Sequence, residues 1–120
     1  MKGLGIDIVA VERIQKACIE NENFCQTLFT QEEQQYCQTY KNPFPHYAGK
    51  FAAKEAVSKA LQCGFGKTLS WLDIQILSTG KTAPQVLLSP AAQEAFSFPQ
   101  FLLSISHCKE YATAVAAWLS

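Results

Sequence analysis

The fold is decided by the stretch YAGKFAAKEAVSKAL, which runs from Tyr47 to Leu61 and contains no proline. Alanine has the highest intrinsic helix propensity, so this stretch predicts one long helix. Its apolar residues recur at helical spacing and define a stripe that faces the core: Ala53, Ala56, Val57, Ala60 and Leu61. Gly64 and Gly66 follow, and we expect them to end the helix.

Upstream of this helix, the opening residues alternate. Leu4, Ile6 and Ile8 fall on one face, while Gly3, Gly5 and Asp7 fall on the other. This period of two predicts a strand and aims Asp7 away from the aliphatic face, with only glycines beside it. From Val11 to about Ile19 the apolar spacing changes to that of an amphipathic helix.

Two local signals predict a short helix between these segments. Thr30-Gln31-Glu32-Glu33 is a capping box, so a helix should continue to about Tyr40. Lys41-Asn42-Pro43-Phe44-Pro45 should break it, because proline lacks the N–H that a helix interior needs.

The second half is predicted to be rich in strands. Leu72, Ile74 and Ile76 alternate with polar neighbours, which predicts a strand. Residues 79–82 predict a turn that leads into a second strand at 85–88. Ser89-Pro90 caps a short helix that Phe98-Pro99 stops, and 101–107 and 113–119 form a hairpin. We therefore expect an α+β fold, in which a small antiparallel sheet packs on one long helix, with residues 1–120 as a single domain.

Composition excludes several functional classes. Ten Lys plus Arg balance ten Asp plus Glu, so no net field attracts nucleic acid or an anionic membrane. No apolar run is long enough to span a bilayer and the amino terminus lacks a secretory layout, so we expect a cytoplasmic protein. The five cysteines include no CxxC pair, which favours reduced structural thiols over a zinc site.

Asp7 and Glu55 are the candidate metal ligands. Asp7 could instead cap the following helix, and Glu55 could form a solvated pair with Lys59, worth about 0.3 to 0.5 kcal/mol. If the two carboxylates converge, they supply the minimum protein contribution to a Mg²⁺ site, whose remaining ligands are commonly waters and substrate phosphates. Lys54, Lys59 and the Gly64-Phe65-Gly66 loop would then be phosphate contacts, although no Walker motif is present.

Ser104-Ile105-Ser106-His107 closes a predicted strand. His107 shares its face with apolar residues, so it could be a core histidine with one hydrogen bond. Serine and histidine this close on one strand do not form a nucleophile and base, which argues against a hydrolase.

Four stretches together resemble the holo-[acyl-carrier-protein] synthase family of 4′-phosphopantetheinyl transferases. They span nearly the whole chain: Gly5-Ile6-Asp7-Ile8 with Glu12-Arg13-Ile14, Phe51-Ala52-Ala53-Lys54-Glu55-Ala56 with Lys59-Ala60, Trp71-Leu72-Asp73-Ile74, and Ser104-Ile105-Ser106-His107 with Lys109-Glu110-Tyr111-Ala112. The resemblance implies Mg²⁺-dependent transfer of phosphopantetheine from coenzyme A to a serine of apo acyl carrier protein, releasing adenosine 3′,5′-bisphosphate in support of fatty acid biosynthesis.

The resemblance also implies roles for individual residues. Asp7 and Glu55 match the metal ligands, Lys59 would meet coenzyme A phosphates, and His107, with Ser106 beside it, would lie near the pyrophosphate or nucleotide phosphate. Arg13 would help to dock the acidic carrier protein, and three copies would assemble with active sites at subunit contacts. The serine proton could pass to a metal-ordered water, to Glu55 or to His107, and we favour water because Glu55 is committed to the ion.

This sequence departs from the family pattern at several places, of which two concern the nucleotide site. Lys50 stands where the family often has arginine, which puts a bidentate contact there in doubt. Gln62-Cys63 replaces a common Gly-Thr, so the nucleotide pocket can differ in shape. Two other classes compete with the enzyme: a non-catalytic module that binds coenzyme A or carrier protein, and a small structural trimer.

Overall fold

The structure is a computed structural model that describes all residues from Met1 to Ser120. Its elements follow the chain in this order: β1 (Gly3–Ala10), α1 (Val11–Glu20), α2 (Phe24–Leu28), α3 (Gln31–Gln38), α4 (Phe44–Ala60), a 3₁₀ turn (Trp71–Asp73), β2 (Ile74–Leu77), β3 (Gln85–Leu88), α5 (Pro90–Ala95), β4 (Phe101–His107) and β5 (Tyr111–Trp118). The predicted α+β class is confirmed, although the strands form two antiparallel sheets instead of one.

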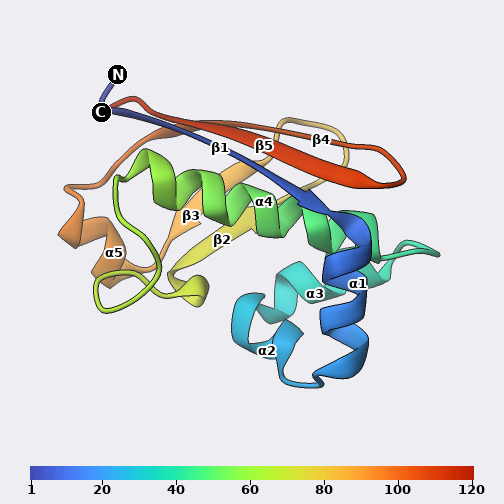
Figure 1. Cartoon of the computed structure of the whole chain (residues 1–120). Coiled ribbons are helices and arrows are strands. Elements are labelled where there is room, and N and C mark those ends of the chain that lie inside the picture. The colour runs from blue at the N-terminus through green and yellow to red at the C-terminus, as the bar shows by residue number, and fades with distance from the viewer.

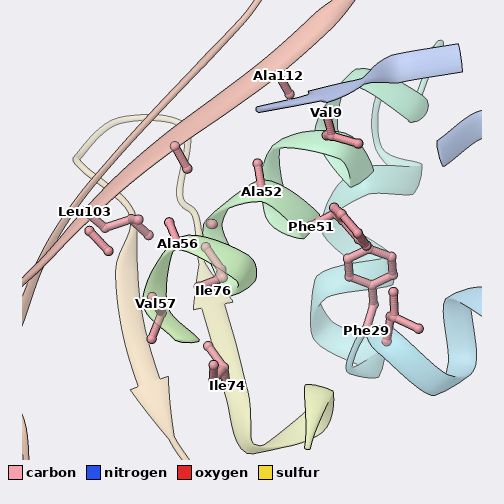
Figure 2. Packing of buried hydrophobic residues seen from close by; sticks show 14 of the residues in the cluster. Val9, Phe29, Phe51, Ala52, Ala56, Val57, Ile74, Ile76, Leu103 and Ala112 are labelled. Atoms are coloured by element: carbon pink, nitrogen blue, oxygen red, sulfur yellow. The ribbon is translucent and has the colours of Figure 1, made fainter. Parts of the chain in front are cut away.

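Helix α4 is the centre of the molecule. The three-stranded sheet, in the order β1-β5-β4, covers one side of it, and the two-stranded sheet β2-β3 lies on another (Figure 1). Figure 2 shows Ala52 and Ala56 of α4 packed among side chains that come from both sheets. The small residues of α4 allow several elements to approach it closely, and the helix is therefore covered on nearly all sides.

The alternation in β1 is confirmed, but the aliphatic face is not the face that packs on α4. Leu4, Ile6 and Ile8 are 59, 65 and 66% exposed. Gly3 and Gly5 face the helix so closely that a Cβ on Gly5 would lie 1.8 Å from the Ala56 carbonyl oxygen. The exposed face extends across the sheet, because Leu4 aligns with Ala117 of β5 and Leu102 of β4, and Ile6 aligns with Val115 and Ser104.

Local capping signals are confirmed. The Thr30 side chain accepts from the Glu33 N–H, and the Glu33 carboxylate accepts from the Thr30 N–H. Ser89 likewise caps α5 by accepting from Ala92 N–H. These pairings join residues three apart, so the sequence alone specifies them.

Two helix boundaries differ from the prediction. Helix α4 begins at Phe44 and not at Tyr47, because Pro43 is its N-cap and Pro45 lies in the first turn, where a missing N–H costs nothing. It ends through Gln62 and not through Gly64 or Gly66. Gln62 has φ of 61°, and its N–H and that of Cys63 donate to the carbonyls of Lys59 and Ser58, which is the Schellman arrangement.

Two smaller elements also differ. Leu72 lies in the 3₁₀ turn, so the strand predicted around it begins only at Ile74. The short helix α2, at Phe24–Leu28, was not predicted. No helix combines the length and the apolar character needed to cross a membrane.

Candidate functional site

The candidate site lies where β1 meets the side of α4. Asp7 is on the inner face of β1, two residues beyond Gly5, and Glu55 and Lys59 stand one helical turn apart on α4. Lys59 Nζ donates to Asp7 Oδ1 at 3.1 Å and to the Ile6 carbonyl at 2.9 Å. Strand and helix residues that are about fifty positions apart are thereby joined.

The glycines of β1 bring these groups together. Gly3 faces Ala60 and Gly5 faces Ala56, so two strand residues advance along the helix as far as four helix residues. Those advances are both about 6 to 7 Å, so strand and helix stay in close contact from Gly3 to Gly5. Thr113 of β5 fixes the strand at this level, since its hydroxyl donates to the Asp7 carbonyl at 2.9 Å.

Charged groups of both signs lie together at this site. Burial of the Glu55 carboxyl raises its pKa, and the nearby negative charge of Asp7 raises it further. The positive charges of Lys59 and Arg13 act in the opposite direction on the same pKa. Arg13 is exposed on α1, with its guanidinium 6.0 Å from the centre of the Phe51 ring. The predicted docking residue therefore lies beside the candidate metal ligands.

Asp7 and Glu55 fit the donor chemistry of a hard divalent cation. Each offers carboxylate oxygens. Burial, followed by the neighbouring charge of Asp7, raises the pKa of Glu55, and a bound cation would relieve the repulsion from Asp7. The chain has no cluster of three or more His, Cys, Asp or Glu residues that could hold a metal by themselves. A bound Mg²⁺ would therefore take its remaining ligands from water or from a substrate.

Lys54 does not belong to this site, which corrects its predicted role as a phosphate contact. Its ammonium is fully buried and pairs with the buried Glu33 carboxylate at 2.8 Å. It also donates to the carbonyls of Leu28 at 2.7 Å and Trp71 at 3.1 Å. Glu33 in turn accepts from Ile76 N–H at 2.8 Å. All of the hydrogen-bonding capacity of Lys54 serves the packing of α2, α3 and the 3₁₀ turn against α4.

His107 lies in a different place, a pocket of about 310 Å³ beside the other end of α4. Its ring is 5.2 Å from that of His46, which stacks on Tyr40 at 3.5 Å. Lys50 also lines this pocket, and its Nζ donates to the Ile76 carbonyl at 2.7 Å and to Ser78 Oγ at 3.1 Å. Burial, together with the charges of His107 and Lys50, lowers the pKa of His46.

The structure does not bring His107 together with Asp7 within one chain. His107 aligns with Ala112 of β5, and Ala112 aligns with Val9 of β1, so the two candidate regions lie on opposite edges of the sheet. Two strand spacings alone separate those edges by about 10 Å. The alternative of a core histidine is wrong for His107, because its side chain is exposed.

The other predicted contacts are scattered. Ser106 aligns with Thr113 and Ile8 on the exposed face of the sheet, opposite to His107. Gly64 and Gly66 lie in an open loop, where no atom would contact an added Cβ within 4 Å. The Phe65 ring between them stacks on Trp71 at 3.8 Å. The pocket around His46 could not be predicted from local sequence patterns, because its walls come from four separate segments.

A family model for the 4′-phosphopantetheinyl transferase superfamily matches residues 3–116. The chain belongs to this superfamily. It is 48% identical over 119 residues to the holo-[acyl-carrier-protein] synthase of Protochlamydia amoebophila, covering 98% of both chains. It is 45% identical over 120 residues to the enzyme of the same name from Chlamydia felis, covering 99% of this chain and 98% of the relative.

Solved structures of the superfamily have the same fold. The holo-[acyl-carrier-protein] synthase of Helicobacter pylori in complex with coenzyme A gives a TM-score of 0.86 at 38% identity, covering 97% of this chain and 99% of that one. The synthase of Neisseria meningitidis gives 0.87 at 27% identity, covering 100% and 99%. These comparisons confirm the resemblance found in the sequence and identify the chain as a transferase of the holo-[acyl-carrier-protein] synthase type.

Proposed function

We propose that this chain transfers the 4′-phosphopantetheine group of coenzyme A to a serine of apo acyl carrier protein in the cytoplasm, releasing adenosine 3′,5′-bisphosphate in support of fatty acid biosynthesis. The observation that carries the proposal is the convergence of Asp7, Glu55 and Lys59 at one edge of α4. It is supported by the similarity to synthases, including the coenzyme A complex of the Helicobacter pylori enzyme. In this proposal residues 1–120 act as one catalytic domain.

In this proposal Asp7 and Glu55 hold Mg²⁺. Bound there, the ion supplies positive charge that neutralises the pyrophosphate oxygens as charge develops during transfer. The Lys59 ammonium adds to that positive charge. It has three N–H donors, and only two of them are used, by Asp7 and the Ile6 carbonyl. Its side chain is 51% exposed, so the third donor can reach a substrate phosphate.

The acceptor of the serine proton stays open among a metal-ordered water, Glu55 and His107. The raised pKa of Glu55 favours a proton on its carboxyl, but metal binding requires its carboxylate form. A water is therefore the acceptor that we favour. Arg13, exposed on α1 beside Glu55, is placed to bind an acidic carrier protein as its serine approaches.

The proposed assembly is a homotrimer, and the exposed sheet face supports it. Leu4, Ile6, Ile8 and Leu102 are each at least 59% exposed and lie together on that face. A second copy would cover this apolar surface. It could also bring the pocket with His46, Lys50 and His107 next to the Asp7 and Glu55 of its neighbour, so that both regions contact one coenzyme A.

The test is to incubate the protein with coenzyme A, Mg²⁺ and an apo acyl carrier protein, and to weigh the carrier. We expect a mass gain of one phosphopantetheine that is lost when Mg²⁺ is chelated. Asp7→Asn and Glu55→Gln should each reduce turnover by roughly tenfold to a hundredfold, as disturbed metal shells do. Glu94→Gln, on α5, is the matched control and should retain the wild-type rate.

A carrier that gains no mass beside a working transferase would favour the alternative of a binding module. Wild-type rates in both acidic-site variants would refute the metal site while leaving the transfer itself established. Light scattering tests the assembly separately, and we expect the mass of three chains.

A further inference from the structure

Two of the five cysteines lie in contact. Cys18 is near the end of α1 and Cys25 is in the first turn of α2, and both are half-buried. Their sulfur atoms form a hydrogen bond with an Sγ to Sγ distance of 3.0 Å. A disulfide has an S–S length of about 2.05 Å, so closure by about 1 Å would join them. No other pair of cysteines forms such a hydrogen bond.

The segment between the two helices holds the thiols in place. Asn21 N–H donates to the Ala17 carbonyl at 3.0 Å, and Phe24 N–H donates to the Asn21 carbonyl at 3.0 Å. The Asn23 N–H donates to Asn21 Oδ1 at 3.1 Å. These bonds make the connection a compact turn, so the two sulfurs meet without a large backbone movement.

The contact also favours ionisation of one sulfur. When Cys25 loses its proton, the S–H of Cys18 can donate to the thiolate, which lowers the pKa of Cys25. The same shared proton, followed by burial, raises the pKa of Cys18. A thiolate beside a protonated thiol is the combination that an oxidation followed by disulfide closure requires.

We propose that Cys18 and Cys25 form a redox site at which hydroperoxides create a reversible intramolecular disulfide. In the first step the Cys25 thiolate attacks one oxygen of hydrogen peroxide, the O–O bond breaks, and a sulfenic acid and hydroxide result. In the second step the Cys18 sulfur attacks the Cys25 sulfur, the S–O bond breaks, and water leaves. Both thiols lose their hydrogens, and the peroxide is reduced to two waters.

The site is independent of the proposed phosphopantetheine transfer. Neither cysteine lines the region of Asp7 and Glu55 or the pocket of His107. A failure of one proposal therefore leaves the other unaffected.

The experiment treats the reduced full-length protein with stoichiometric hydrogen peroxide, blocks the remaining thiols by alkylation, and measures intact mass. Glu20 and Glu22 lie between the two cysteines, so a glutamate-specific protease separates their peptides unless a disulfide links them. We expect three alkyl groups per chain in place of the five on the reduced protein, a linked Cys18–Cys25 peptide pair, and recovery of both free thiols with a dithiol reductant. Cys18→Ser should trap the Cys25 sulfenic acid as a dimedone adduct.

Cys63→Ser is the matched control, because Cys63 is also half-buried but has no sulfur partner, and it should form the disulfide at the wild-type rate. Cys25→Ser should form an intramolecular disulfide at least tenfold more slowly. The proposal is overturned if Cys18 and Cys25 stay alkylatable at a peroxide dose that oxidises Cys63 or Cys108. It is also overturned if the wild-type disulfide joins a different pair.

Discussion

Gly5→Ala should separate the strand from the helix that together carry the candidate site. The added Cβ would lie 1.8 Å from the Ala56 carbonyl oxygen and 2.8 Å from the Ala60 nitrogen. Both contacts are with backbone, so no side-chain rotation relieves them. Helix α4 would have to move away from β1 by more than 1 Å, and it also packs against β5, β4 and β2.

The cost can be worked from these contacts. Overpacking of a core costs about 1 to 3 kcal/mol, and a clash between two rigid backbones belongs at the upper end. Alanine gains about 0.4 to 1 kcal/mol by restricting the unfolded chain. The free energy of unfolding should therefore fall by about 2 to 3 kcal/mol, out of the roughly 5 to 15 kcal/mol of a typical domain.

Urea denaturation of both proteins measures this loss, with Gly66→Ala as the control. A Cβ on Gly66 meets no atom within 4 Å, so that variant should be as stable as the wild type or slightly more stable. The transfer rate of Gly5→Ala should also fall below that of the wild type under conditions where it stays folded, because Glu55 moves away from Asp7. Equal stability of the two alanine variants would refute the close approach of β1 and α4.

Three further predictions test other parts of the structure. Lys54→Met leaves the Glu33 carboxylate buried without its cation, so the free energy of unfolding in urea should fall by about 3 to 5 kcal/mol; a higher KM for coenzyme A with unchanged stability would instead restore Lys54 as a phosphate contact. Gln62→Gly removes a side chain from a left-handed position at φ of 61° and should raise the free energy of unfolding by about 1 kcal/mol, which thermal denaturation would detect as a higher Tm. A lower Tm would contradict the left-handed helix end at Gln62. Because the pKa of Glu55 is raised, protons should compete with Mg²⁺ for its carboxylate at a higher pH than they would for an ordinary glutamate. The Mg²⁺ concentration for half-maximal transfer should therefore rise as the pH falls through the pKa of Glu55. Asp7→Asn removes the neighbouring negative charge and should shift this rise to lower pH, which Mg²⁺ titrations at several pH values would detect.

Much of the candidate site was predictable because its signals are local. The spacing of Glu55 and Lys59 places them on one side of a helix, and the period of two in β1 places Asp7 on the same face as Gly3 and Gly5. The structure joins Asp7 to Lys59, a pair that the sequence did not predict, because Lys59 was expected to pair with Glu55 or to contact a phosphate. The role of Lys54 was mispredicted because a lysine in a helix motif looks the same whether it faces solvent or a buried carboxylate 21 positions earlier.

Local sequence signals are sufficient to predict the helix around FAAKEA, the capping of α3 and α5, the alternation of β1 and the family. These properties depend on residues within a few positions of one another, or on a motif preserved in order. Three-dimensional packing was needed to establish that glycine, and not isoleucine, faces α4, that His107 lies at the far edge of the sheet, and that Cys18 contacts Cys25. A period of two separates the faces of a strand, but only the shape of the packing partner selects which face is buried. Here the Ala56 carbonyl of α4 occupies the space that a side chain on Gly5 would need.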